Sequence, residues 1–281
     1  MTVVTFGGLT FNDAATAGFT LSDLAGWYSG APSRRSVRDR PLADGAFGVS
    51  RFYRGARVIS VQGSYIGSSV ADAYQARDTL AALQSDGRSS QFVVTDDLGV
   101  RSCSVELISE PVPDEGLFSP FFKWSFDVVA PDPRKYGPTL APFTGLPTAG
   151  TGYVWPAVWP ADWGSGGNPG RVTASNTGTS ATEPVLEVLG GLAGGVELVE
   201  VTTGSYLRLE RDIPSTSTVF FNTRTARAYL DVPANDISSF LTRRDWGGFS
   251  IPAGGTRTVQ FNGLGAVSGT PRLTVRFSPA F

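Results

Sequence analysis

Hydrophobic and polar residues alternate along several stretches of the first 133 residues. The clearest is FFKWSFDVVA at 121–130, in which apolar and polar positions exchange at every step from Phe122 to Val128. Successive side chains of a strand point to opposite faces, so this pattern predicts one buried face and one that is wetter or in an interface. Strands are also predicted in ARVISVQGSYIG at 56–67, in QFVVT at 91–95 and in VRSCSVELIS at 100–109, and the turn sequence DDLG separates the last two.

One stretch has the spacing of a helix. Its apolar residues recur at intervals of three and four and form one stripe: Val70, Ala73, Ala76, Leu80 and Leu83. Ser69 has the side chain of an N-cap, and Asp72 places negative charge in the first turn. We therefore predict a single helix at 69–84, packed on the β-sheet that the neighbouring strands form.

After residue 171 the pattern changes to many short strands separated by turns. Eight segments are predicted as strands: RVTASN, PVLEVLG, VELVEV, SYLRLE, TVFFN, ARAYL, TRTVQFN and PRLTVRFS. Short alternating strands at close spacing indicate a sandwich or a barrel. The glycine-rich NGLGAVSG at 262–269 lies between two strands and opens no helix, so we interpret it as a turn and not as a phosphate-binding loop.

Proline and glycine dominate residues 134–170, which we predict to link a first domain at 1–133 to a second at 171–281. This stretch holds three tryptophans at intervals of four: Trp155, Trp159 and Trp163. Two interleaved prolines argue against a helix, and on an extended chain the three indoles would share a face. They could bind a sugar, contact a protein partner or seal a domain junction. Their position between two predicted domains favours the junction.

Residues 34–50 have no periodicity and concentrate positive charge. The cluster consists of Arg34, Arg35, Arg38 and Arg40. The segment is predicted to be a long loop or an extended arm. Two interpretations stay open: a solvated loop that Asp39 partly neutralises, or an arm that contacts an acidic neighbouring subunit, because arginine is enriched at interfaces.

Composition removes most kinds of catalytic site. The 281 residues include no histidine, so the commonest general acid and base near neutral pH is missing, as are Ser-His and Cys-His nucleophile systems and histidine metal sites. Cys103 lies on the apolar side of a predicted strand and is interpreted as a small buried hydrophobe. Asp96-Asp97 and Asp114-Glu115 are interpreted as turn residues, because a glycosidase needs two carboxylates facing each other across a cleft. We expect no enzyme activity, no cofactor and no metal.

The charge content points to a turn-rich β protein. Charged residues make up 17% of the chain, which also holds 34 glycines and 19 prolines. The net charge of −2 gives no sign of a nucleic acid or an anionic membrane as a partner. We also find neither a secretory signal nor an apolar run long enough to span a membrane.

Taken in order, four segments resemble the distal tail proteins of long, non-contractile-tailed bacteriophages, a group of minor tail proteins. The segments are GARVISVQGSYIGSSVADAYQARDTLAALQ, VVAPDPRKYGP, the run from WPAVWPADWG through NTGTSATEPVLEV to LRLERDI, and IPAGGTRTVQF. Each motif is loose, and their order along the chain is the specific part.

The resemblance implies an N-terminal β-sandwich-like domain with one α-helix, related to tail-tube proteins, that closes into a homo-hexameric ring. It implies a C-terminal galectin-like β-sandwich that projects outward. It further implies a virion protein of the tail tip, assembled in the host cytoplasm, whose partners are the tail tube protein, the tape measure protein and the baseplate hub or tail-associated protein. The alternative is a carbohydrate-binding module that recognises a host cell-wall glycan, and a glycan-cleaving enzyme ranks third.

Overall fold

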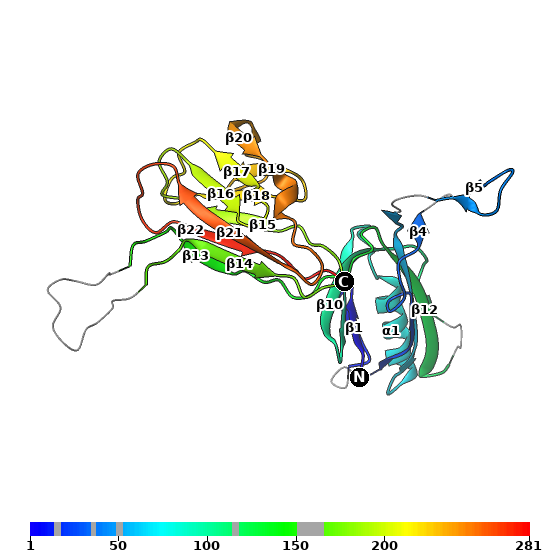
Figure 1. The fold of residues 1–281 in the computed structure, drawn as a ribbon. Helices are drawn as coiled ribbons and strands as arrows, with labels where there is room; N and C mark the ends of the chain where they lie inside the picture. Colours follow the sequence, from blue (N-terminus) through cyan, green and yellow to red (C-terminus); the bar gives the residue numbers. More distant parts are fainter. Residues whose placement is uncertain (14–17, 35–37, 49–52, 114–117, 151–165) are drawn as a thin grey trace, which may run out of the picture. The chain divides into compact units, whose positions relative to one another are not determined.

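A computed structural model of the chain describes residues 1–13, 18–34, 38–48, 53–113, 118–150 and 166–281 (Figure 1). The chain divides into two compact units, Met1–Tyr136 and Gly137–Phe281. Both units consist mainly of antiparallel strands, and α1 (Val70–Ala81) is the one α-helix of the described residues. This confirms the mainly β fold class with a single helix that the sequence predicts. Each unit is described by itself below.

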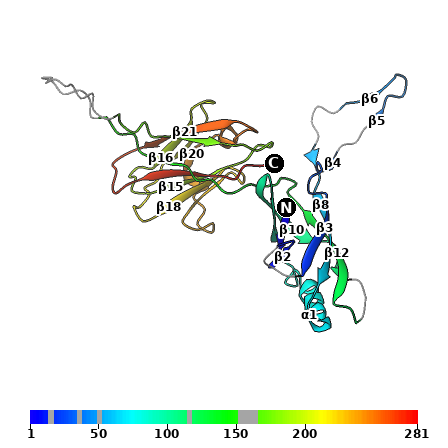
Figure 2. The same cartoon turned by 90° about the horizontal axis from the view of Figure 1, so that it is seen from below.

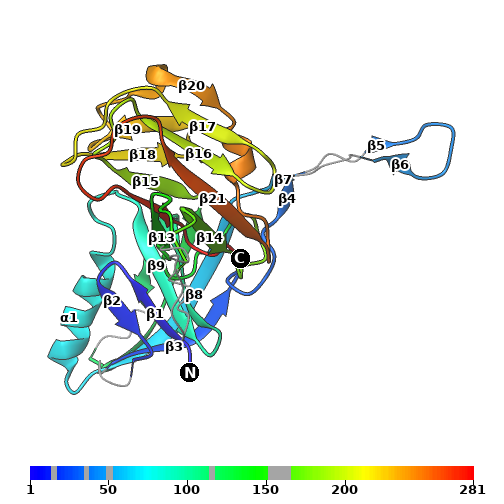
Figure 3. The ribbon, with the colours of Figure 1, turned by 60° about the vertical axis from the view of Figure 1, so that its left-hand side comes forward.

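Unit 1 contains one eight-stranded antiparallel sheet that folds over on itself (Figure 3). Its strands are β1 (Val3–Phe6), β2 (Leu9–Phe11), β3 (Phe19–Ala25), β8 (Arg57–Ile66), β9 (Ser90–Asp96), β10 (Gly99–Leu107), β11 (Val112–Pro113) and β12 (Phe121–Ala130). Their order is β2-β1-β9-β10-β12-β8-β3, and β11 also pairs with β12. The two halves of the sheet face each other across the core, as in a sandwich.

Aromatic rings fill the space between the two halves. The rings of Phe6 in β1 and Phe126 in β12 have centroids 5.6 Å apart, and those of Phe11 in β2 and Trp124 in β12 are 4.7 Å apart. The two ends of the sheet also approach each other, because the Asn12 N–H donates to the Phe19 carbonyl at 2.8 Å. Aromatic pairs at such distances add to the stabilisation that burial of their apolar area gives.

The sequence pattern of unit 1 reappears in its burial. All four apolar positions predicted for the inner face of 121–130 are buried: Phe122, Trp124, Phe126 and Val128. Helix α1 begins after its N-cap Ser69, whose side chain accepts from the Asp72 N–H at 3.2 Å. Its residues Ala73, Ala76 and Leu80 lie in the same core as the sheet. The predicted strand and the predicted helix are therefore both confirmed.

A glutamine side chain marks the point where the sheet changes direction. Strand β10 pairs with β9 up to Val105 and with β12 from Glu106 onward. At this change of partner, the Gln84 amide donates to the Val105 carbonyl at 3.1 Å and accepts from the Leu107 N–H at 2.6 Å. Gln84 itself has a positive φ of 51°. The side chain thus replaces a missing ladder partner, which a buried backbone group requires.

Unit 2 is a β-sandwich of two five-stranded antiparallel sheets, ordered β13-β22-β15-β18-β19 and β14-β21-β16-β17-β20. Its strands are β13 (Phe143–Gly145), β14 (Arg171–Ser175), β15 (Val185–Leu189), β16 (Val196–Glu200), β17 (Tyr206–Leu209), β18 (Thr218–Asn222), β19 (Arg227–Leu230), β20 (Leu241–Arg244), β21 (Thr256–Gly263) and β22 (Arg272–Arg276), with short 3-10 helices η1 (Ser238–Phe240) and η2 (Trp246–Phe249). Each of the eight strands predicted after residue 171 is present, and β13 and β20 are additional.

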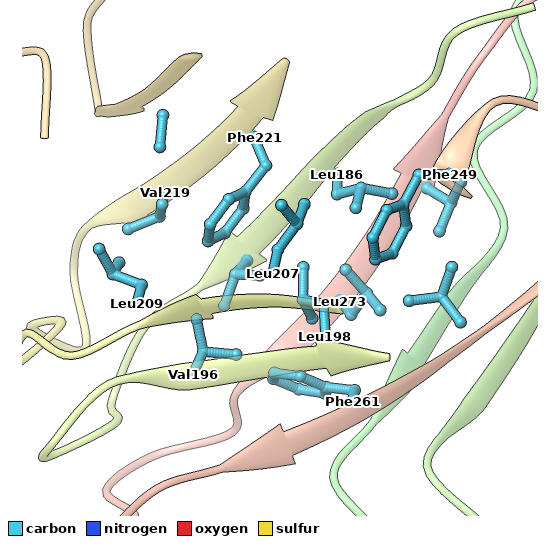
Figure 4. Close-up of a cluster of buried hydrophobic side chains, with 14 of the residues drawn as sticks. Leu186, Val196, Leu198, Leu207, Leu209, Val219, Phe221, Phe249, Phe261 and Leu273 are labelled. Atoms are coloured by element: carbon cyan, nitrogen blue, oxygen red, sulfur yellow. The ribbon is translucent and has the colours of Figure 1, made fainter. Parts of the chain in front are cut away.

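The inner faces of these two sheets meet in one apolar core (Figure 4). Leu186, Phe221 and Leu273 come from the first sheet, and all three are fully buried. Leu198 and Phe261 approach them from the second sheet and are likewise fully buried. The alternation that predicts each short strand therefore places its apolar residues between the sheets.

The predicted linker differs from the structure. The chain passes from unit 1 to unit 2 between Tyr136 and Gly137, and β13 already pairs with β22 inside unit 2. Further along, the Thr148 N–H donates to the Asn168 carbonyl at 2.9 Å, and the Asn168 N–H donates to Thr148 Oγ1 at 3.0 Å. Thr148 and Asn168, which flank the tryptophan-rich stretch, therefore lie side by side in unit 2. Proline and glycine mark a break in regular structure, but they do not tell where the chain goes next.

Candidate assembly surfaces

The DPRKY sequence closes unit 1 through a carboxylate cluster. Asp132 accepts from the Arg134 backbone N–H at 3.2 Å, from Arg134 Nε at 3.1 Å and from the Tyr136 hydroxyl at 2.7 Å. Burial by itself would raise the pKa of Asp132, but the hydrogen bonds from Arg134 and Tyr136 outweigh it and lower the pKa to about 2. The motif therefore acts as a structural clasp at the end of the unit.

Two buried cations tie this clasp to the loop at 26–29. Arg57 Nη1 donates to the carbonyls of Gly26 at 2.8 Å and Ser29 at 2.6 Å, and its Nε donates to Pro133 at 3.0 Å. Lys135 Nζ donates to the Trp27 carbonyl at 3.1 Å and lies 5.1 Å from the centroid of the Trp27 ring. Burial lowers the pKa of both cations. The DPRKY motif is visible in the sequence. No local pattern connects Arg57 to it, so the sequence does not reveal the role of Arg57.

The described cysteine and carboxylates that were weighed as catalytic or metal-binding residues have environments typical of structural roles. Cys103 is buried, and burial raises its pKa to about 12, so it stays a protonated thiol at neutral pH. Asp96 accepts from the Leu98 N–H at 2.8 Å, as expected of a turn residue, whereas Asp114 and Glu115 lie outside the described residues. In the described part of the chain, no group of three or more His, Cys, Asp or Glu residues could hold a metal.

No helix of the described residues has the length and apolar character that a membrane span needs.

The arginine-rich segment of unit 1 forms two short ribbons, which we call the arm (residues 32–55). Strand β4 (Ser33–Arg34) pairs with β7 (Tyr53–Arg54), and β5 (Arg38–Asp39) pairs with β6 (Ala46–Phe47) (Figures 2 and 3). The Gly55 N–H donates to the Pro32 carbonyl at 2.6 Å and closes the base. The described residues of the segment therefore contain two strand pairs, which fits the extended arm better than the long loop, the two structures that the sequence predicts.

Of the four predicted arm arginines, the structure describes three. Arg34, Arg38 and Arg40 are all exposed, and Arg35 lies outside the described residues. Apolar side chains accompany them: Leu42 is fully exposed and Phe47 is 59% exposed. Both apolar side chains are therefore accessible to a partner. The contact of these arginines with a neighbouring subunit stays a prediction.

The outer face of the unit 1 sheet also presents apolar residues. Register places Glu106 of β10 opposite Val129 of β12, and Val129 opposite Val58 of β8. Val58 lies in β8 and Ile108 directly follows β10, and each is at least half exposed, although the other face of both strands is in the core. Asp127 lies two residues from Val129 on the same face. We call Val58, Glu106, Ile108, Asp127 and Val129 the acidic–apolar patch.

The predicted junction tryptophans, Trp155, Trp159 and Trp163, lie outside the described residues. The residues on either side of this stretch belong to unit 2 and unit 1 ends at Tyr136, so the chain passes between the units before the stretch and not within it. What the three indoles contact stays a prediction.

Unit 2 carries a shallow depression of about 620 Å³ on the outer face of β16, β17 and β20. Arg208 lies between two carboxylates, at 3.5 Å from Glu197 and 2.8 Å from Glu210. Tyr206 also lines the depression, but the Arg243 guanidinium lies 5.3 Å from the centroid of its ring. Sugars bind proteins through hydrogen-bonding side chains and an open aromatic face. Here the groups bond one another and the ring face is covered, which weakens the interpretation as a glycan site.

No family model matches the sequence, and no curated protein matches it. Among solved structures, the chain has the fold of hub and baseplate proteins of bacteriophage tails.

The Dit protein of phage SPP1, described as a paradigm of the hub adsorption apparatus in phages that infect Gram-positive bacteria, aligns with a TM-score of 0.69 at 16% identity. The alignment covers 100% of this chain and 99% of that one, and so includes both units. Two structures of the phage P2 baseplate in its activated conformation, with Ca and with Sr, give TM-scores of 0.56 and 0.55 at 9% identity. They cover 98% of this chain and 98% and 97% of their own chains.

Proposed function

We propose that this protein is a structural protein of a phage virion, a hexameric adaptor at the distal end of the tail of a long-tailed phage. In this role unit 1 closes the ring and contacts the tail tube. Unit 2, a galectin-like sandwich, faces outward toward the baseplate hub. The tape measure protein is the third partner. The protein acts by shape, sheet edges and buried apolar contacts, without making or breaking bonds.

One observation carries the proposal. The fold match to a phage hub protein runs through both units in the same chain order, at full coverage of either chain. A match to one sandwich would carry little, because sandwich architectures serve many unrelated functions. The order of two different units, one with a single helix and one without, is far more specific.

The surface of unit 1 supports the same proposal. An arm with exposed leucine, phenylalanine and arginine side chains gains nothing in an isolated chain, because water-exposed apolar area is unfavourable. In a ring of identical subunits, each copy offers one surface and receives another, and the contact closes by rotation. An arm on one side of a unit is well suited to such a head-to-tail contact.

The test is the assembly state of the purified full-length protein. We expect native mass spectrometry to give a species of six times the 29.7 kDa chain mass, and negative-stain electron microscopy to give six-fold rings. A protein that stays monomeric at every soluble concentration, and is monomeric in virions as well, would overturn the adaptor. A monomer that binds members of a glycan array would favour the carbohydrate-binding module instead.

A further inference from the structure

Charge is separated within unit 1 in a way that the net charge of the chain conceals. The arm, residues 32–55, holds six arginines and two aspartates, a formal charge of +4. The other residues of 1–136 hold seven lysines and arginines and thirteen aspartates and glutamates, a formal charge of −6. A cationic arm on an acidic body has complementary charge for a second copy of the same body.

The arm displays its cations and its apolar groups on one face. Register places Arg38 directly opposite Phe47, so these two side chains share a face of the ribbon. The Arg40 guanidinium lies 5.8 Å from the centroid of the Phe47 ring, on that same face. Leu42 follows at the turn with its side chain fully exposed. The face therefore combines two arginines with a phenylalanine, next to an exposed leucine at the turn.

The acidic–apolar patch of unit 1 has the matching composition. Its centre is formed by Val58, Val129 and Ile108, and its charged groups are Glu106 and Asp127. The Ile108 N–H donates to the Asp127 carbonyl at 2.9 Å, which fixes the two residues as neighbours. Two carboxylates beside exposed aliphatic groups suit a partner that brings arginine and apolar side chains together.

The spacing of the charges also agrees. Arg38 and Arg40 are two residues apart, a separation of about 6.5–7 Å along a strand. Glu106 faces Val129, so Asp127 is its diagonal neighbour, at about 7–8 Å between the two residues. Each arginine can therefore meet one carboxylate while the apolar groups between them come into contact.

We infer that the arm of one copy docks on the acidic–apolar patch of a second copy of this chain. This inference rests on the proposed ring and names the surfaces that close it. The base of the arm is held at Pro32 and Gly55, close in sequence to Val58. In a ring of identical subunits each body lies beside the next, so the patch that receives the arm is that of the neighbouring copy.

The test uses two full-length variants that cannot dock on themselves. The arm variant carries Arg38→Glu and Arg40→Glu, and the patch variant carries Glu106→Arg and Asp127→Arg. In either one alone, like charges meet at every contact, so we expect loss of the ring in native mass spectrometry under conditions where the unchanged protein assembles. In an equimolar mixture, each arm meets an opposite patch. The mixture should assemble again, with equal numbers of the two chains and only even-numbered species.

A matched control separates docking from overall charge. Asp78→Arg with Asp97→Arg makes the same change in net charge as the patch variant, at exposed positions away from the patch. This control should assemble by itself and should fail to restore assembly of the arm variant. Circular dichroism and thermal unfolding of each monomer establish that the variants are folded.

A second measurement does not depend on charge. Leu42→Cys with Ile108→Cys in one chain should give covalent oligomers of up to six chains with a short bismaleimide, and either cysteine alone should give none. Cys103 does not interfere because it is only 2% exposed.

The outcomes distinguish the inference from the function on which it rests. If the unchanged protein never assembles, the ring itself is wrong. If the unchanged protein forms rings and the arm variant or the patch variant alone forms rings too, the docking site is wrong and the ring stands. The same conclusion follows if the mixture stays monomeric and the paired cysteines do not cross-link between chains. Cross-linking within single monomers would place the arm on its own chain and would also overturn the inference.

Discussion

The two units have equally complete cores but different surfaces. Residues 137–281 hold ten basic and ten acidic residues, and charged groups there bond within the unit, as where Arg276 donates to Glu187 at 2.6 and 3.1 Å. Unit 1 instead places its positive charge on the arm and its negative charge on the body. Large apolar side chains are exposed on both units, among them Phe47 on the arm and Phe143 in unit 2, so the separation of charge and not apolar exposure is the difference. The comparison teaches that the distribution of charge on the surface, and not the core, distinguishes the two units.

The largest expected effect on stability comes from a substitution that disrupts the core of unit 2 and leaves the core of unit 1 intact. Phe221→Ala removes a fully buried ring from unit 2, so we expect that unit to lose about 3–5 kcal/mol of unfolding free energy. Scanning calorimetry should show the transition of unit 2 at a lower temperature and that of unit 1 unchanged. The control is Phe220→Ala, on the outer face beside Tyr229, with a much smaller loss. A joint shift of both transitions would show that the units are not independent.

The next effect concerns the buried cations of unit 1. Arg57→Met removes the donor for carbonyls of the 26–29 loop and of Pro133, and buried carbonyls left without donors are costly. We expect a loss of about 3 kcal/mol from unit 1 in chemical denaturation. Arg54→Met, on the exposed arm, should change stability by less than about 0.5 kcal/mol. Equal effects of the two substitutions would contradict the clasp.

A smaller effect depends on pH. The pKa of Asp132 is about 2 in the folded unit, below its ordinary value near 4, so its carboxylate stabilises the fold at neutral pH. That stabilisation, roughly 2 kcal/mol with allowance for solvent at the half-buried group, should be lost as the pH falls from about 4 to about 2. Urea unfolding across this range measures it. Asp132→Asn should be less stable at pH 7 and should lack this part of the acid dependence.

The smallest effect on folding belongs to the arm. Leu42→Ser changes a fully exposed side chain, so the unfolding free energy of the monomer should stay within about 0.5 kcal/mol of the unchanged protein. Assembly should nevertheless weaken, because the substitution removes apolar area from the proposed contact. Sedimentation velocity measures the fractions of monomer and of assembled protein in one sample, and urea unfolding measures the stability of the monomer. A loss of monomer stability with unchanged assembly would show that Leu42 serves its own chain.

The sequence predicts elements whose signal is local. Alternation in residues 121–130 identifies β12 along its whole length, and the Ser69 cap with the apolar stripe identifies α1. Each depends on neighbours within a few positions, so nothing distant is needed to find it.

What the sequence does not reveal depends on partners far along the chain. Arg57 meets Pro133 across 76 positions, and β13 is a three-residue strand that exists because β22 accepts it. The same limit explains the linker. The hydrogen bonds between Thr148 and Asn168 bring the chain back to unit 2 across a segment whose prolines and glycines indicate only an interruption. The arm arginines, by contrast, form a local concentration of positive charge that the sequence alone reveals.

The most direct test of the account is an electron cryomicroscopy reconstruction of the assembled full-length protein. We predict a six-fold ring closed by contacts between copies of residues 1–136, with each arm crossing to its neighbour and residues 137–281 outside the ring. A ring closed by residues 137–281, or particles that contain a single chain, would contradict it.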